Sequence, residues 1–155
     1  MRLWFDRAVG AQMDFQEAYN AFAWALRPRW HGSHAEMLLF AEECVRSDRF
    51  DTLVPSNYLK LVREVASEES DHDAIYKRPA IYRNLKFVLG KYLRSSDMPF
   101  SRTYAHTLAA ILDYKNGNLP GARNHLASLN FQPDPASDLS LLEDLPRMVK
   151  TLSSL

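Results

Sequence analysis

Apolar residues recur every three or four positions along most of the chain, in runs that prolines, glycines and short polar segments separate. Ala18, Phe22 and Ala25, for example, fall at i, i+4 and i+7 within the stretch 14–26. This spacing gathers apolar side chains on one face of an α-helix, and no run shows the alternation that indicates a strand. The pattern predicts an all-α protein of about eight helices, arranged as consecutive antiparallel pairs.

Capping residues and prolines predict where these helices begin and end. A short helix is expected over 3–12, and Asp14 is expected to cap the next helix, which ends before Pro28. Ser33 and Glu36 have the spacing of a capping box at the start of a third helix. That helix is expected over 35–46, and further helices over 57–66, 80–94, 103–115, 121–129 and, with a bend near Pro146, from Ser137 to Leu155. Ser101 and Ser137 are expected to cap the helices that follow them.

A turn followed by a helix returns at a regular interval. Phe15 and Phe50 are 35 residues apart, and Phe50 and Leu119 are 69 residues apart, close to twice that interval. Helical solenoids have repeats of about 34 residues, because each helix pair buries its apolar face only by stacking on its neighbours. The interval therefore predicts a solenoid-like array.

Residues 114–122, YKNGNLPGA, resemble the tetratricopeptide repeat. Gly117 stands at the turn glycine of that motif, and Ala122 stands at the small residue of its second helix. Ala110 corresponds to the small residue of the first helix, and Leu126 to a large apolar site. The resemblance implies a right-handed array of helix pairs whose first helices line a groove.

Elsewhere the resemblance is looser, and it covers roughly half of the chain. The further matches are Phe15, Ala18, Phe22, Ala25, Ala41 and Phe50. Pro55 interrupts the second helix of the middle repeat, so the middle of the chain is expected to depart from regular stacking. Residues 24–43, WALRPRWHGSHAEMLLFAEE, resemble a bacterial family called domain of unknown function 4034, which implies a helical, repeat-like domain and no particular activity.

Composition narrows the class of protein. The 155 residues are enough for one domain, predicted over 1–155, and the first helix begins so early that the chain is compatible with a segment of a longer protein. Nineteen basic and nineteen acidic residues give no net charge, which argues against a nucleic-acid or membrane partner. Cys44 is the single cysteine, and no signal peptide or membrane span is apparent. We expect a soluble cytoplasmic protein with Cys44 buried.

A corner between two predicted helices carries the first candidate site. Arg27, Arg29, Trp30 and Ser33 lie where two guanidinium groups and the free N–H groups of a helix start can converge on a phosphate or carboxylate. Packing of the tryptophan and solvation of the arginines is the commoner use of such a corner. The anion site is kept as an alternative.

Histidines provide two further candidates. His31 and His34 form an H-x-x-H pair that can supply two zinc ligands, but a third ligand must come from elsewhere, and capping or surface roles are preferred. His106 and His125, on successive helices, face either each other or solvent, and a structural role is preferred to a catalytic one. The chain contains no Walker loop, G-x-G-x-x-G or H-E-x-x-H motif, so neither a cofactor nor an enzyme is predicted.

The leading hypothesis is a non-enzymatic interaction module that binds a protein or peptide in a helical groove. By analogy with the tetratricopeptide repeat, the predicted groove residues are Arg7, Leu38, Glu42, Arg46, Thr107, Ile111, Tyr114 and Lys115. Their tyrosine, isoleucine and basic side chains suit a segment with an acidic residue or a C-terminal carboxylate. The hypothesis requires these side chains to be accessible and to share a face. The alternatives are an enzyme or ligand-binding domain with a pocket near Arg27 to His34, and a structural self-association domain.

Overall fold

The computed structural model describes residues 1–96, 98–135 and 145–154 of the chain. All regular secondary structure in these ranges is helical, which confirms the prediction of an all-α protein. The α-helices are α1 (Arg2–Ala11), α2 (Gln16–Ala25), α3 (His34–Arg46), α4 (Asn57–Glu68), α5 (Pro79–Arg94), α6 (Arg102–Lys115), α7 (Leu119–Ala127) and α8 (Leu145–Ser153). Three short 3-10 helices are η1 (Pro28–Trp30), η2 (Val54–Ser56) and η3 (Ile75–Lys77).

Two of the predicted caps are present. The Oγ atom of Ser33 accepts a hydrogen bond from the N–H of Glu36 at 3.2 Å, and that of Ser101 accepts one from the N–H of Tyr104 at 3.4 Å. The Ser33 hydroxyl also donates to the Glu36 carboxylate at 2.9 Å. Each serine thus satisfies one of the free N–H groups at its helix start.

The cap predicted for α2 is wrong. Phe15 occupies the N-cap position without a side-chain cap, so Asp14 lies one residue too early to reach the free N–H groups of the helix. The Asp14 carboxylate instead accepts a hydrogen bond from the Gln12 side-chain amide at 3.3 Å. The cap predicted at Ser137 lies outside the described residues.

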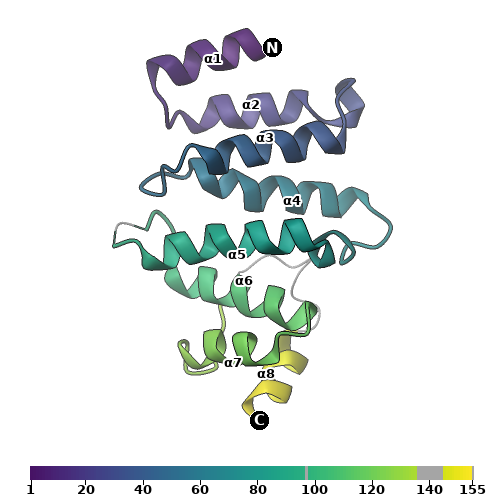
Figure 1. Ribbon diagram of the computed structural model, residues 1–155, viewed down its shortest axis with the longest axis vertical. Coiled ribbons are helices and arrows are strands. Elements are labelled where there is room, and N and C mark those ends of the chain that lie inside the picture. Colours follow the sequence, from purple (N-terminus) through teal and green to yellow (C-terminus); the bar gives the residue numbers. More distant parts are fainter. Residues whose placement is uncertain (97, 136–144, 155) are drawn as a thin grey trace. The chain divides into compact units, whose positions relative to one another are not determined.

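The helices form two compact units, Met1–Glu68 and Glu69–Leu155, and each is described by itself. In the first unit, α1 to α4 follow one another side by side (Figure 1). Its core contains an aromatic cluster in which the Phe40 ring lies 5.2 Å from that of Phe5 and 4.8 Å from that of Phe22. The prediction of a single domain over 1–155 stays a prediction.

Polar contacts in the first unit also join each helix to the next but one. Arg2 of α1 pairs with Glu43 of α3 at 2.7 Å. The Gln16 amide of α2 donates to Asn57 of α4 at 2.7 Å. These contacts add to the packing of α1 against α2 and of α3 against α4.

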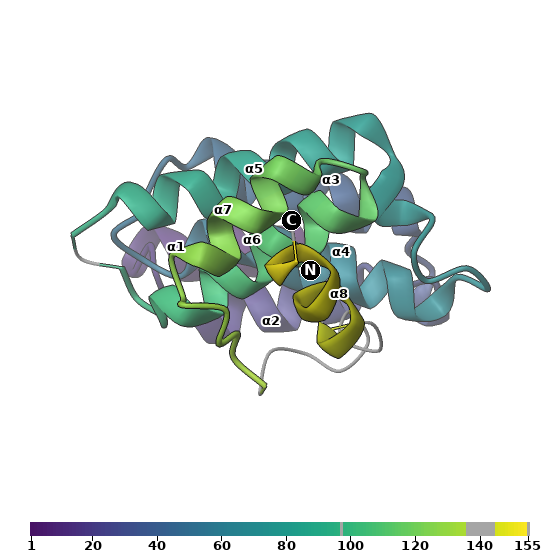
Figure 2. The same cartoon turned by 90° about the horizontal axis from the view of Figure 1, so that it is seen from below.

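In the second unit, α6 is the central helix, since it packs against α5, α7 and α8. Figure 2, a view from below, shows α7 and α8 next to each other in front of α6. Met148 and Leu152 of α8 are buried, and the N–H of Asp134 donates to the Thr107 hydroxyl at 2.9 Å. One face of α6 is consequently covered by the last part of the described chain.

Candidate functional site

A depression of about 410 Å³ opens on the second unit at the C-terminal end of α6. Its lining comes from four elements and includes both charged and apolar side chains: Asp73, Lys77, Tyr114, Lys115, Leu119 and Thr151. Two of these, Tyr114 and Lys115, belong to the predicted groove. The depression therefore has the size and the mixed lining of a site for a few residues of a peptide.

Lys115 is the most buried charge of this lining. Its ammonium group donates to both carboxylate oxygens of Asp73, at 2.6 and 2.7 Å. The Lys115 side chain is 11% exposed, whereas that of Asp73 is 37% exposed. Asn116 fixes the adjacent backbone by donating to the carbonyl oxygen of Tyr76 at 3.2 Å. A nearly buried cation is thus held beside the depression with one anionic partner.

A second polar cluster lies between α5, α6 and α7, around Asp113. This carboxylate is fully buried and accepts hydrogen bonds from the Tyr82 hydroxyl and the Lys86 ammonium group, both at 2.6 Å. Burial, together with the bond to Asp113, raises the pKa of Tyr82. Gly121 lies against this cluster, and a Cβ atom added there would collide with the Asp113 carboxylate and with Asn118. The cluster ties three helices together through one carboxylate.

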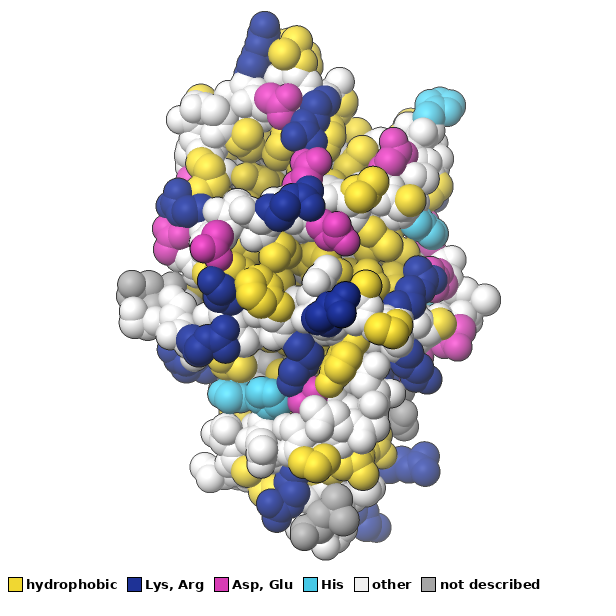
Figure 3. Space-filling model, in the orientation of Figure 1, with side chains coloured by type: hydrophobic (Ala, Val, Ile, Leu, Met, Phe, Trp, Pro, Cys, Tyr) yellow, Lys and Arg dark blue, Asp and Glu magenta, His cyan; other side chains and the backbone are white. Residues whose placement is uncertain are grey.

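The histidine pair extends this cluster to the surface. Lys86 contacts Nε2 of His125 at 3.2 Å, and the Nδ1 atoms of His125 and His106 are 3.0 Å apart. An ammonium group only donates, so Nε2 of His125 accepts, Nδ1 of His125 donates to His106, and the proton of His106 is on Nε2. Figure 3 shows histidine side chains meeting on one face of the molecule. Of the two arrangements left open by the sequence, the histidines adopt the one in which they face each other.

Both histidines are held in the neutral form. Burial and the nearby Lys86 charge lower the pKa of His125 to about 4, against the opposing effect of Asp113. Burial, followed by the charge of Arg102, lowers the pKa of His106. Near neutral pH the chain Lys86–His125–His106 is therefore a set of directed hydrogen bonds with a single charge at one end.

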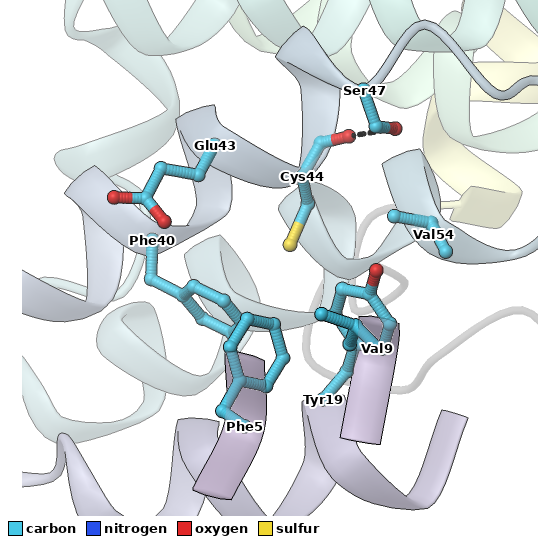
Figure 4. A pocket seen from close by; sticks show the side chains of 8 residues that line it. All are labelled: Phe5, Val9, Tyr19, Phe40, Glu43, Cys44, Ser47 and Val54. Carbon is cyan, nitrogen blue, oxygen red and sulfur yellow. Dashed lines mark hydrogen bonds between the residues drawn. The ribbon is translucent and has the colours of Figure 1, made fainter. Parts of the chain in front are cut away.

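A small cavity of about 120 Å³ in the first unit surrounds the single cysteine. Figure 4 shows the Cys44 sulfur pointing between the Phe5 and Tyr19 side chains. The residue is 1% exposed, which confirms the prediction that it is buried. Burial, followed by the charge of Glu43, raises the pKa of the thiol to about 12, so very little reactive thiolate is present.

The predicted anion corner has most of its polar groups engaged within the first unit. Arg27 contacts Glu64 at 2.9 Å and lies over the Trp24 ring at 4.6 Å. The Ser33 hydroxyl caps α3, and Arg29 and Trp30 are exposed beside it. The helix start thus already has an acceptor in the place where an anion would bind.

The two predicted zinc ligands, His31 and His34, do not share a contact. His34 Nε2 is 2.8 Å from the Glu68 carboxylate, and His31 is an exposed residue with a φ angle of 70° that ends η1. Throughout the described ranges, no group of three or more His, Cys, Asp and Glu side chains is placed to hold a metal ion.

Two of the predicted groove residues do not face an open groove. Thr107 and Ile111 are buried, and the Thr107 hydroxyl both donates to Thr103 and accepts from Asp134. Neither side chain is accessible to a partner, because α5, α7 and α8 pack against α6 and Asp134 contacts Thr107.

The other predicted groove residues belong to the first unit. Arg7 lies 5.8 Å from the Trp4 ring, and Arg46 lies 3.9 Å from Glu42, while Leu38 is half-buried. Asp73 and Lys77, which were not among the predicted groove residues, line the depression with Tyr114 and Lys115.

Comparisons of the chain with protein-family models, with curated proteins and with solved structures find no match. Each helix in the described parts of the chain falls short of the length and apolarity that a membrane crossing requires.

Proposed function

We propose that this chain is a non-enzymatic interaction module that binds an acidic peptide segment in the depression of the second unit. The observation that carries the proposal is the lining itself: the nearly buried Lys115, the exposed Lys77, and the apolar surfaces of Tyr114 and Leu119. The two ammonium groups outnumber the one carboxylate, Asp73. The site thus favours a ligand that brings a negative charge together with an apolar side chain.

The packing of each unit supports a helical-repeat architecture for this module. In the first unit α1 packs on α2 and α3 on α4, with polar contacts from α1 to α3 and from α2 to α4. In the second unit α8 packs on α6, and Lys86 of α5 contacts His125 of α7. Contacts between alternate helices are typical of solenoids, including tetratricopeptide-like arrays. Such arrays bind peptides along the surface that their helices create.

The chemistry of the depression supports binding rather than catalysis. Its lining side chains carry two ammonium groups, one carboxylate, a phenol and a hydroxyl. A nucleophilic mechanism needs a base within hydrogen-bonding distance of the nucleophile, and the Asp73 carboxylate is engaged by Lys115. The same groups suffice to recognise a carboxylate and an adjacent apolar residue.

A peptide-selection experiment tests the proposal. The protein is presented with a display library of random heptamers that have either aspartate or asparagine fixed at the central position. We expect enrichment of the aspartate library by wild type and its loss in Lys115→Met. Arg83→Met, which removes an exposed cation on α5 outside the lining, is the matched control and should retain the enrichment. Equal selection by wild type and Lys115→Met would contradict the proposal.

A further inference from the structure

Asp73 occupies the position at which a ligand carboxylate would meet Lys115. Both of its oxygens contact the ammonium group, and the two residues are 42 positions apart in the chain. Asp73 belongs to the acidic segment 67–74, SEESDHDA. The contact is therefore made by an acidic peptide segment of the protein itself.

The turn that carries Asp73 is held by other contacts. The Asp71 carboxylate accepts hydrogen bonds from the N–H groups of Asp73, at 3.0 Å, and Ala74, at 3.2 Å. Before the turn, Glu69 pairs with Arg78 at 2.7 Å. The backbone is consequently fixed whether or not the Asp73 side chain stays on Lys115.

The two partners differ in how readily they can be separated. Lys115 is nearly buried, so leaving its charge without a carboxylate would be costly. Asp73 is more than a third exposed, and such partly solvated ion pairs add little stability. An exchange of one carboxylate for another keeps Lys115 paired and releases Asp73 to water.

We propose that Asp73 is an internal pseudo-ligand, and that an acidic peptide binds by displacing its carboxylate from Lys115. This inference rests on the proposed function and adds a regulation to it. The occupant is an aspartate- or glutamate-bearing segment similar to 67–74, because that is the chemistry the site already holds. Lys77, exposed at the same depression, adds a second attraction for such a segment.

The experiment uses the full chain and a synthetic copy of its own segment, acetyl-SEESDHDA-amide. Binding is followed by NMR titration of wild type, Asp73→Asn, Asp71→Asn and Lys115→Met. Asp71→Asn is the matched control, since it changes the net charge equally and keeps an oxygen that accepts the turn hydrogen bonds. We expect Asp73→Asn to bind the peptide about fivefold more tightly than wild type, and Asp71→Asn to bind as wild type does.

A second peptide, acetyl-SEESDHNA-amide, identifies the displaced group. It should bind Asp73→Asn several-fold more weakly than the parent peptide, and Lys115→Met should bind neither. If Asp73→Asn gains no affinity while Lys115→Met still loses it, the pseudo-ligand is wrong and the binding site stands. If Lys115→Met binds the parent peptide as wild type and Asp73→Asn do, both the site and the pseudo-ligand are wrong.

Discussion

The half-buried histidine pair should make the stability of the second unit depend on pH. His125 has a pKa of about 4 in the folded protein, against an ordinary value of 6.5. At pH values between these two, the unfolded chain binds a proton that the folded chain does not, so the free energy of unfolding falls as the pH falls. The contribution is complete above pH 6.5 and is lost by about pH 4.

The size of this effect follows from the pKa difference. One pKa unit corresponds to about 1.4 kcal/mol, so the difference at His125 corresponds to about 3 kcal/mol. Its side chain is 22% exposed, and screening by water reduces the expected loss to about 2 kcal/mol. The lowered pKa of His106 acts in the same direction.

Urea unfolding at pH 7.5, 5.5 and 4.2 measures this loss in wild type and in His125→Gln. Glutamine can still accept a hydrogen bond from Lys86 but does not titrate, so the variant should lose about 2 kcal/mol less than wild type over this range. His31→Asn, which removes an exposed histidine of the first unit, should follow wild type. Parallel losses in wild type and His125→Gln would refute the reasoning.

Three further predictions follow from the packing. Gly121→Ala should lower the free energy of unfolding, measured in urea, by about 1–3 kcal/mol, because the added Cβ atom collides with Asp113. Gly90→Ala should raise it by about 0.5–1 kcal/mol, because there the added Cβ atom meets only the flexible end of a side chain within α5. The Cys44 thiol should resist iodoacetamide at pH 7.5 and react once urea unfolds the chain; fast native alkylation would contradict its burial. Ser33→Ala should cost about 1 kcal/mol, measured by thermal unfolding, and an unchanged melting temperature would show that its cap adds nothing.

The helices themselves were predictable because each carries its own apolar stripe and some, such as α3 and α6, carry their own caps. Ser33 and Ser101 illustrate this, since cap and helix are adjacent in the chain and their hydrogen bonds are local. Asp14 shows the limit of such reasoning. The helix begins one residue later than predicted, so that Phe15 and not Asp14 occupies the N-cap position. Residue type alone does not determine at which residue a helix begins.

The candidate site was only partly predictable because it depends on contacts between distant segments. The analogy with the tetratricopeptide repeat assigned Tyr114 and Lys115 to a groove, and both line the depression. It also assigned Thr107 and Ile111, which are buried. The polar, acidic composition of segment 67–74 is typical of a solvated loop and does not indicate that Asp73 reaches Lys115.

Asp113 could have been detected in the sequence. It falls three and four positions after Ala110 and Ala109, so it continues an apolar stripe of α6 with a charged side chain. A carboxylate at such a position needs donors from neighbouring helices, and Tyr82 and Lys86, four residues apart on α5, supply them.

Three consecutive residues of α6 connect the stability of the second unit to its proposed function. Successive helical residues point about 100° apart, so Asp113 and Lys115 face different neighbours. Asp113 is held by α5, whereas Tyr114 and Lys115 line the depression, and Lys115 is paired with Asp73. The buried network therefore fixes the end of the helix from which Lys115 reaches its carboxylate partner. Exchange of that partner needs movement only of the Asp73 side chain, and α6 can keep its position throughout.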